Sequence, residues 1–220
     1  MASEKNCTVK DQKNCTNCDL KESLDCRWNK NILNCFIAIA SPIFIGVFLL
    51  LGVIFLISGE WWPFIAYVLF IFLIFGYEIK FLCSHCPFYN NEGKFLKCLA
   101  KNGAPKIFKY NPAPMNRFEK FMMNFLVWMN CTIIPLSAGS LALWMLYSQN
   151  ATTIILYGTT GIFVMTLLAS VVFFQIMKVY YCAKCINFSC PLNTVEKKVV
   201  DKYLLKNDVM REAWEKSGYK

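Results

Sequence analysis

Long runs without a charged residue constrain the fold of this chain more than any other feature. Charged side chains are absent between positions 30 and 60, 60 and 78, and 120 and 178. A hydrocarbon core about 30 Å thick needs roughly 20 apolar residues in a helix that crosses it. The last run has room for two such helices, and the polar stretch YSQNATT (147–153) divides it. We therefore predict an all-α integral membrane protein with transmembrane helices at about 34–58, 61–81, 121–147 and 153–178.

The basic residues predict the orientation of these helices. All 23 Lys and Arg residues lie in three segments, 5–30, 80–120 and 178–220. The two short connectors between predicted spans contain none, and positive charge is usually retained on the cytoplasmic side of a membrane. Four spans return both termini to one side. We expect a multi-pass membrane protein with its N- and C-termini in the cytoplasm, where its net charge of +9 faces anionic lipids.

The cysteines recur in register with the two predicted hairpins. The first hairpin ends in Cys83-x2-Cys86-x11-Cys98, and the second ends in Cys182-x2-Cys185-x4-Cys190. Each segment also contains a Cys-Pro pair. We interpret this pattern as two duplicated hairpins that carry a cysteine-rich cytoplasmic layer.

The predicted segments follow from this pattern. They are a cysteine-rich N-tail (1–33), a transmembrane hairpin (34–82), a basic loop (83–120), a second hairpin (121–181), and a cysteine motif with an amphipathic helix (182–220). Within the last segment we expect one helix over 193–216. Its apolar stripe of Val195, Val199, Tyr203 and Leu204 is expected to pack on the cysteine segments or to lie at the membrane interface. We also expect Glu78 to pair with a lysine or to reach headgroup water.

Clustered cysteines in a reducing compartment are typical of metal sites or redox-active thiols rather than of structural disulfides. The candidate metal ligands are Cys7, Cys15, Cys18, Cys26, Cys83, Cys86, Cys98, Cys182, Cys185 and Cys190. An iron–sulfur cluster, [4Fe–4S] in the first place, is held by four thiolates, often with a proline after one ligand. Zn²⁺ bound by four cysteines is the alternative. The N-tail either supplies a fourth ligand to each hairpin triad or forms a site of its own.

Three functions are compatible with these observations. The first is a membrane-anchored iron–sulfur protein for electron transfer or redox sensing, with an acidic redox protein or a membrane complex as its partner. The second is a non-catalytic scaffold or assembly subunit stapled by zinc. The third is a membrane thiol oxidoreductase that uses Cys83 and Cys86 or Cys182 and Cys185.

The positions of histidine and of the basic residues bear on which cofactors and partners are expected. The predicted spans contain no histidine, which excludes haem held by two histidines. The lone histidine, His85, is expected to be a solvated bystander between two cysteines. The basic residues flank the spans, so the membrane topology explains them and no nucleic-acid partner is predicted.

Overall fold

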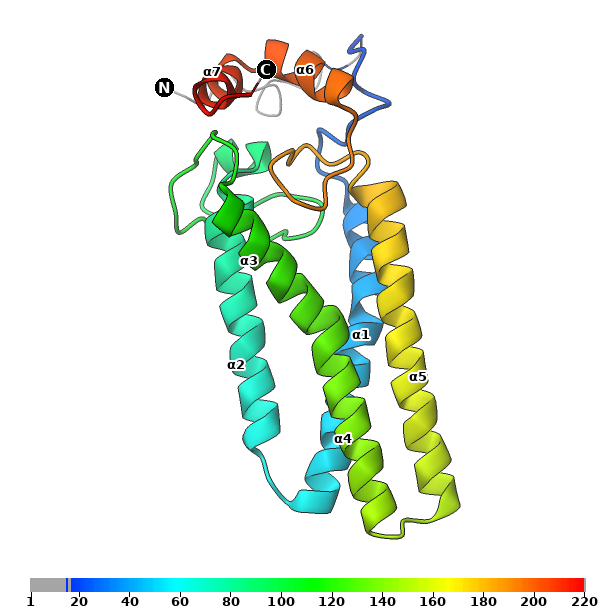
Figure 1. Ribbon diagram of the computed structural model, residues 1–220. Coiled ribbons are helices and arrows are strands. Elements are labelled where there is room, and N and C mark those ends of the chain that lie inside the picture. Colours follow the sequence, from blue (N-terminus) through cyan, green and yellow to red (C-terminus); the bar gives the residue numbers. More distant parts are fainter. Residues whose placement is uncertain (1–14, 16, 220) are drawn as a thin grey trace. The chain divides into compact units, whose positions relative to one another are not determined.

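The computed structural model describes residues 15 and 17–219, and the regular structure in that part of the chain is helical (Figure 1). Its long helices have the length and apolar composition of membrane spans. They are Lys30–Ser58, Trp62–Cys83, Arg117–Ser148 and Thr153–Tyr181. Each coincides with a predicted span, so the all-α class and the presence of four helices capable of crossing a membrane are confirmed.

Three of these helices contain a π-helical turn. The α-helical parts are α1 (Lys30–Ser58), α2 (Trp62–Tyr77), α3 (Arg117–Trp128), α4 (Ile134–Ser148) and α5 (Thr153–Ile176). The π-helical turns are Glu78–Cys83, Met129–Ile133 and Met177–Tyr181. The turn at Met129–Ile133 ends two residues before Pro135, which lacks a backbone N–H, and a local widening of the helix accommodates that missing donor.

By its internal packing the described chain divides into two compact units. We call residues 35–75 and 125–175 the span unit, because they come from the apolar helices. We call the remaining segments the loop unit; it contains the described residues up to 34, then 76–124 and 176–219. The loop unit includes a 3₁₀ turn (Pro87–Asn90) and the short helices α6 (Lys197–Leu205) and α7 (Asp208–Lys216).

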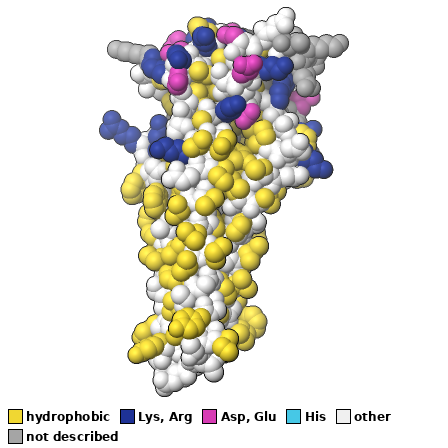
Figure 2. Space-filling model, turned by 90° about the vertical axis from the view of Figure 1, so that its right-hand side faces the viewer, with side chains coloured by type: hydrophobic (Ala, Val, Ile, Leu, Met, Phe, Trp, Pro, Cys, Tyr) yellow, Lys and Arg dark blue, Asp and Glu magenta, His cyan; other side chains and the backbone are white. Residues whose placement is uncertain are grey.

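The span unit is held together by close packing of small residues and aromatic rings. A Cβ atom added to Gly46 on α1 would lie 2.0 Å from Thr166 Oγ1 on α5, so glycine lets these helices approach. Phe48 packs edge-on against Tyr67, and the Tyr67 hydroxyl donates to Asn130 Oδ1 at 3.4 Å. Figure 2 shows one face on which apolar side chains cover these helices, as expected for contact with lipid.

The loop unit has a separate core in which cysteines pack with aromatic and aliphatic side chains. Its buried members are Leu20, Leu24, Ile79, Cys83, Cys86, Phe88, Tyr89, Leu96, Ala104, Ile186, Val200, Tyr203, Leu204, Met210 and Trp214. The N-tail contributes Leu20 and Leu24, and the backbone N–H of Asp25 donates to the Lys184 carbonyl at 2.9 Å. The described part of the N-tail is therefore folded against the segment that carries Cys182 and Cys185.

The prediction of one continuous helix over 193–216 is wrong. The structure has α6 and α7, separated at Lys206 and Asn207. The Asn207 side chain is fully buried, and its Nδ2 donates to the Tyr203 carbonyl at 2.6 Å, which ends α6 by competing for its last backbone acceptors. The predicted stripe does pack on the cysteine segments: Tyr203 and Leu204 belong to the same core as Cys83 and Cys86.

Candidate functional site

Six of the predicted cysteines lie in one neighbourhood of the loop unit, and we call them the six-cysteine group: Cys83, Cys86, Cys98, Cys182, Cys185 and Cys190. Their thiols are close enough to act on one another electrostatically. Cys86 interacts with Cys185 and Cys98, and Cys83 interacts with Cys98 and Cys190. None of the six is in a disulfide. Two segments almost a hundred residues apart in sequence thus bring their thiols together.

Both Cys-Pro pairs begin a turn that is closed by the same backbone hydrogen bond. The Cys86 carbonyl accepts the N–H of Tyr89 at 2.8 Å, and the Cys190 carbonyl accepts the N–H of Asn193 at 3.0 Å. In each case proline is the second residue of the turn, where its fixed φ is favourable. Cys86 itself is extended, as a residue before proline must be. The turn therefore explains why proline follows each cysteine, whether the cysteines bind an iron–sulfur cluster or Zn²⁺.

Backbone N–H groups point at four of the six sulfurs. Cys98 Sγ accepts the Lys101 N–H at 3.0 Å, and Cys185 Sγ accepts the Asn187 N–H at 3.4 Å. Cys86 accepts from Phe88, and Cys190 accepts from Leu192 and Asn193. Hydrogen bonds of this kind stabilise negative charge on sulfur and tune a bound metal or cluster.

Burial is the main influence on these thiols in the metal-free chain. It raises the pKa of Cys182, Cys185 and Cys190 to about 12, and nearby thiols add to the effect. Burial also raises the pKa of Cys86 and Cys98. The thiolate is the form that takes part in thiol–disulfide exchange, and a raised pKa makes it scarce at neutral pH. The environment of Cys182 and Cys185 therefore does not favour the oxidoreductase alternative.

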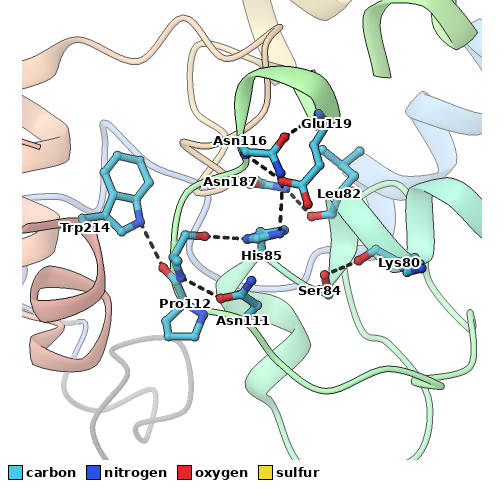
Figure 3. A network of polar contacts seen from close by, with 11 residues as sticks. Lys80, Leu82, Ser84, His85, Asn111, Pro112, Asn116, Glu119, Asn187 and Trp214 are labelled. Carbon is cyan, nitrogen blue, oxygen red and sulfur yellow. Dashed lines mark hydrogen bonds and ion pairs between the residues drawn. The ribbon is translucent and has the colours of Figure 1, made fainter. Parts of the chain in front are cut away.

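The two cysteine segments are joined by a buried amide that the sequence analysis did not single out. Asn187 lies between Cys185 and Cys190, and its Nδ2 donates to the Leu82 carbonyl at 2.9 Å (Figure 3). Asn193 Nδ2 in turn donates to the Cys185 and Asn187 carbonyls at 2.8 and 3.1 Å. The only signal in the sequence is the position of each asparagine two or three residues after a cysteine.

His85 is buried rather than solvated, so the expectation of an exposed bystander is wrong. Its exposed fraction is 4%, its Nδ1 bonds the Ala113 carbonyl, and its Nε2 lies 3.9 Å from Glu119 Oε2 (Figure 3). Glu119 also accepts the Asn116 N–H at 2.7 Å, while Asn116 Oδ1 accepts the Glu119 N–H at 2.8 Å. This capping box starts α3, and His85 links it to the Cys-x-x-Cys turn.

Glu78 pairs with Lys101, which agrees with the first of the two alternatives expected for this residue. Both side chains are mostly buried, with exposed fractions of 11% and 22%. Lys101 follows Cys98 by three residues, and its charge acts on both Cys83 and Cys98. The pair therefore places one positive and one negative charge beside the six-cysteine group.

Two of the N-tail cysteines, Cys18 and Cys26, are partly buried and pack against the same core as Cys83 and Cys86. Cys15, Cys18 and Cys26 line a cavity of about 490 Å³ together with Lys21, Arg27 and Trp28. Cys7 lies outside the described residues.

The thiols have not converged on a single point. Within residues 15 and 17–219, no three Cys, His, Asp or Glu side chains are arranged as a metal ion requires. Metal binding by the ten predicted cysteines therefore stays a prediction. Comparisons with protein-family models, with curated proteins and with solved structures find no match to this chain.

Proposed function

We propose that this chain is a membrane-anchored iron–sulfur protein that transfers electrons or senses redox state at the cytoplasmic face. The six-cysteine group is the observation that carries this proposal. It gathers more thiols than the four that one cluster needs, from two distant segments, in one buried neighbourhood. [4Fe–4S] is the favoured cluster, and Cys83, Cys86, Cys98, Cys182, Cys185 and Cys190 are the pool of ligands.

The surroundings of the six-cysteine group support a cluster whose potential is set by the protein. Backbone donors reach four of the sulfurs, and Phe88, Tyr89 and Tyr203 belong to the apolar core around them. Hydrogen bonds to sulfur and exclusion of water are two of the means by which a protein tunes an iron–sulfur potential. Lys101 adds a positive charge that partly offsets the negative charge of four thiolates.

Binding would require the thiols to turn toward a common centre. A change of side-chain rotamer costs on the order of 1 kcal/mol. Structural zinc sites bind with about 10–16 kcal/mol at neutral pH, so a thiolate-bound metal can drive such rearrangements. The proposal therefore requires movement of side chains within the loop unit.

Duplication of the two hairpins is part of the proposal. The second and fourth long helices both end in a π-helical turn, Glu78–Cys83 and Met177–Tyr181, at the first cysteine of a Cys-x-x-Cys motif. Both segments also contain a proline turn that starts at a cysteine. These shared local structures support a common origin. The distribution of Lys and Arg supports placing both termini in the cytoplasm.

A zinc-stapled scaffold is the second candidate. It is favoured by the burial of Cys83, Cys86 and Cys182, since structural zinc sites are closed to solvent. Four cysteines drawn from both segments would then clip residues 83–98 to residues 182–190 without a redox role.

Serine variants of single cysteines test the proposal. We expect Cys86→Ser, purified without oxygen, to lose most of its iron, sulfide and visible absorbance. The matched control is Cys35→Ser, because Cys35 is exposed and lies outside the six-cysteine group. Equal loss in both variants, or no loss in either, contradicts the assignment of the ligands.

A further inference from the structure

Two cysteines outside the six-cysteine group lie beside cationic side chains. Arg27 Nη2 donates a hydrogen bond to Cys15 Sγ at 3.2 Å, and Lys206 Nζ donates to Cys18 Sγ at 3.7 Å. Cationic side chains at these positions attract an anionic reaction partner. Both cysteines are partly exposed. Cys15 and Cys18 are thus more accessible than the buried Cys86 and Cys182, although Cys18 also packs against the core of the loop unit.

The backbone holds the two cysteines near each other. The Cys18 N–H donates to the Cys15 carbonyl at 3.4 Å, which closes a turn with two residues between the cysteines. The ends of such a turn lie within about 7 Å of each other at Cα. This range overlaps the Cα separations found in disulfides, about 4.4–6.8 Å. Neither cysteine is in a disulfide in this structure, so the pair is a dithiol that can close.

The cavity next to this dithiol admits a small ligand. It measures about 490 Å³, and both sulfur-bearing residues line it together with Lys21 and Arg27. Two basic side chains in the wall attract a ligand that carries carboxylates. Asp25 is the acidic residue in the wall, so the lining carries more positive than negative charge.

We propose that Cys15 and Cys18 form a thiol–disulfide exchange site for small anionic disulfides of the glutathione class. This site goes beyond the proposed metal centre and uses none of the six-cysteine group, although Cys15 and Cys18 are among the ten ligands predicted from the sequence. Cys15, beside Arg27, attacks one sulfur of the small disulfide; its S–S bond breaks and one thiolate leaves. Cys18 then attacks the Cys15 sulfur, an intramolecular disulfide forms and the second thiolate leaves. Two electrons pass from the protein dithiol to the small disulfide, and the two cysteine protons pass to the leaving thiolates.

Closure of the disulfide has a structural consequence on α6. Lys206 bonds Asp19 as well as Cys18, and so joins the N-tail to the end of that helix. Oxidation replaces the Cys18 thiol in this contact by a disulfide sulfur, while the ion pair of Lys206 with Asp19 stays. The dithiol thereby reports the redox state of its surroundings to the C-terminal helices.

Glutathione disulfide is the probe that tests the site. The full-length protein in detergent is incubated with it, and each cysteine is scored by mass spectrometry after alkylation of the remaining thiols. We expect a Cys15–Cys18 disulfide in the wild type, a stable Cys15–glutathione adduct in Cys18→Ser, and unchanged oxidation in Cys26→Ser. We expect Arg27→Gln to slow the reaction about tenfold, and Lys30→Gln, its matched control, to leave the rate unchanged.

Two outcomes overturn the proposal. One is that Cys15 and Cys18 react no faster than Cys26. The other is that both are protected until a chelator is added, which assigns them to a metal instead. Iron, sulfide and zinc are measured on the same preparations, so failure of the metal centre and failure of the exchange site give different results.

Discussion

Asn187 donates its side-chain amide to the Leu82 carbonyl at 2.9 Å, and this bond joins the segment of Cys185 and Cys190 to the helix end that carries Cys83. Asn187 is 5% exposed, so its removal leaves a poorly hydrated carbonyl without its donor. We expect Asn187→Ala to lower the free energy of unfolding by about 1–3 kcal/mol. Denaturant unfolding in detergent measures this, with the exposed Asn102→Ala as control. Equal stability of the two variants contradicts a joining role.

The ion pair of Glu78 and Lys101 gives a second prediction. Removal of one partner leaves the other charge mostly buried, so Lys101→Met is expected to destabilise the protein by about 2–4 kcal/mol. The double variant Glu78→Gln/Lys101→Met is expected to recover most of that loss. Glu196→Gln is the control, because the Glu196–Lys198 pair is exposed and contributes about 0–1 kcal/mol. A double variant as unstable as the single one refutes the coupling.

The approach of α1 and α5 at Gly46 gives a third prediction. A methyl group at Gly46 meets the Thr166 side chain, whereas one at Gly52 on the same helix meets nothing within 4 Å. We expect Gly46→Ala to destabilise the protein by about 1–3 kcal/mol through overpacking. Gly52→Ala is expected to be neutral or stabilising by up to about 1 kcal/mol, since alanine is the better helix former. Thermal unfolding in detergent compares the two, and similar midpoints would falsify the packing of α1 on α5.

The buried thiols predict how stability depends on pH in the metal-free protein. Cysteine in an unfolded chain titrates near pH 8.5, whereas burial raises the pKa of Cys182, Cys185 and Cys190 to about 12. Between these values the folded state keeps protons that the unfolded state has lost. The contribution of these three thiols to the free energy of unfolding is therefore complete below about pH 8.5, and it decreases as the pH rises toward 12. Denaturant unfolding at pH 7.5 and pH 10 measures the fall, and equal stability at both contradicts it.

Bound metal is expected to remove most of that pH dependence. Thiolate ligands are deprotonated already at neutral pH, so the loaded protein is expected to show little change between pH 7.5 and pH 10. The comparison of loaded and metal-free protein thus links the pH dependence to the six-cysteine group.

Two features of the sequence, its long uncharged runs and its repeated cysteine spacing, predict the spans and the meeting of the two cysteine segments. Uncharged runs of membrane length leave few alternatives to a helix, and the four helices agree with their predicted ranges. The repeated spacing of cysteines after each hairpin led us to expect that the two segments meet, and the bond of Asn187 to the Leu82 carbonyl joins them. A shared site of Cys83, Cys86, Cys182 and Cys185 stays a prediction.

Other features depend on tertiary contacts that have no local signature. The residues 193–216 have helical propensity throughout, and the break at Asn207 arises because its side chain is buried and bonds Tyr203. His85 lies in a polar loop, yet the carbonyl of Ala113 and the carboxylate of Glu119, both distant in sequence, provide it with partners in the interior.

The metal content of the full-length protein, purified without oxygen, is the most direct test of the proposed function. The account predicts stoichiometric iron and acid-labile sulfide, with visible absorbance that bleaches on reduction. Stoichiometric zinc without sulfide contradicts the iron–sulfur centre and favours the stapled scaffold. A protein that contains neither metal, and takes up neither on reconstitution, contradicts a metal centre in the six-cysteine group altogether.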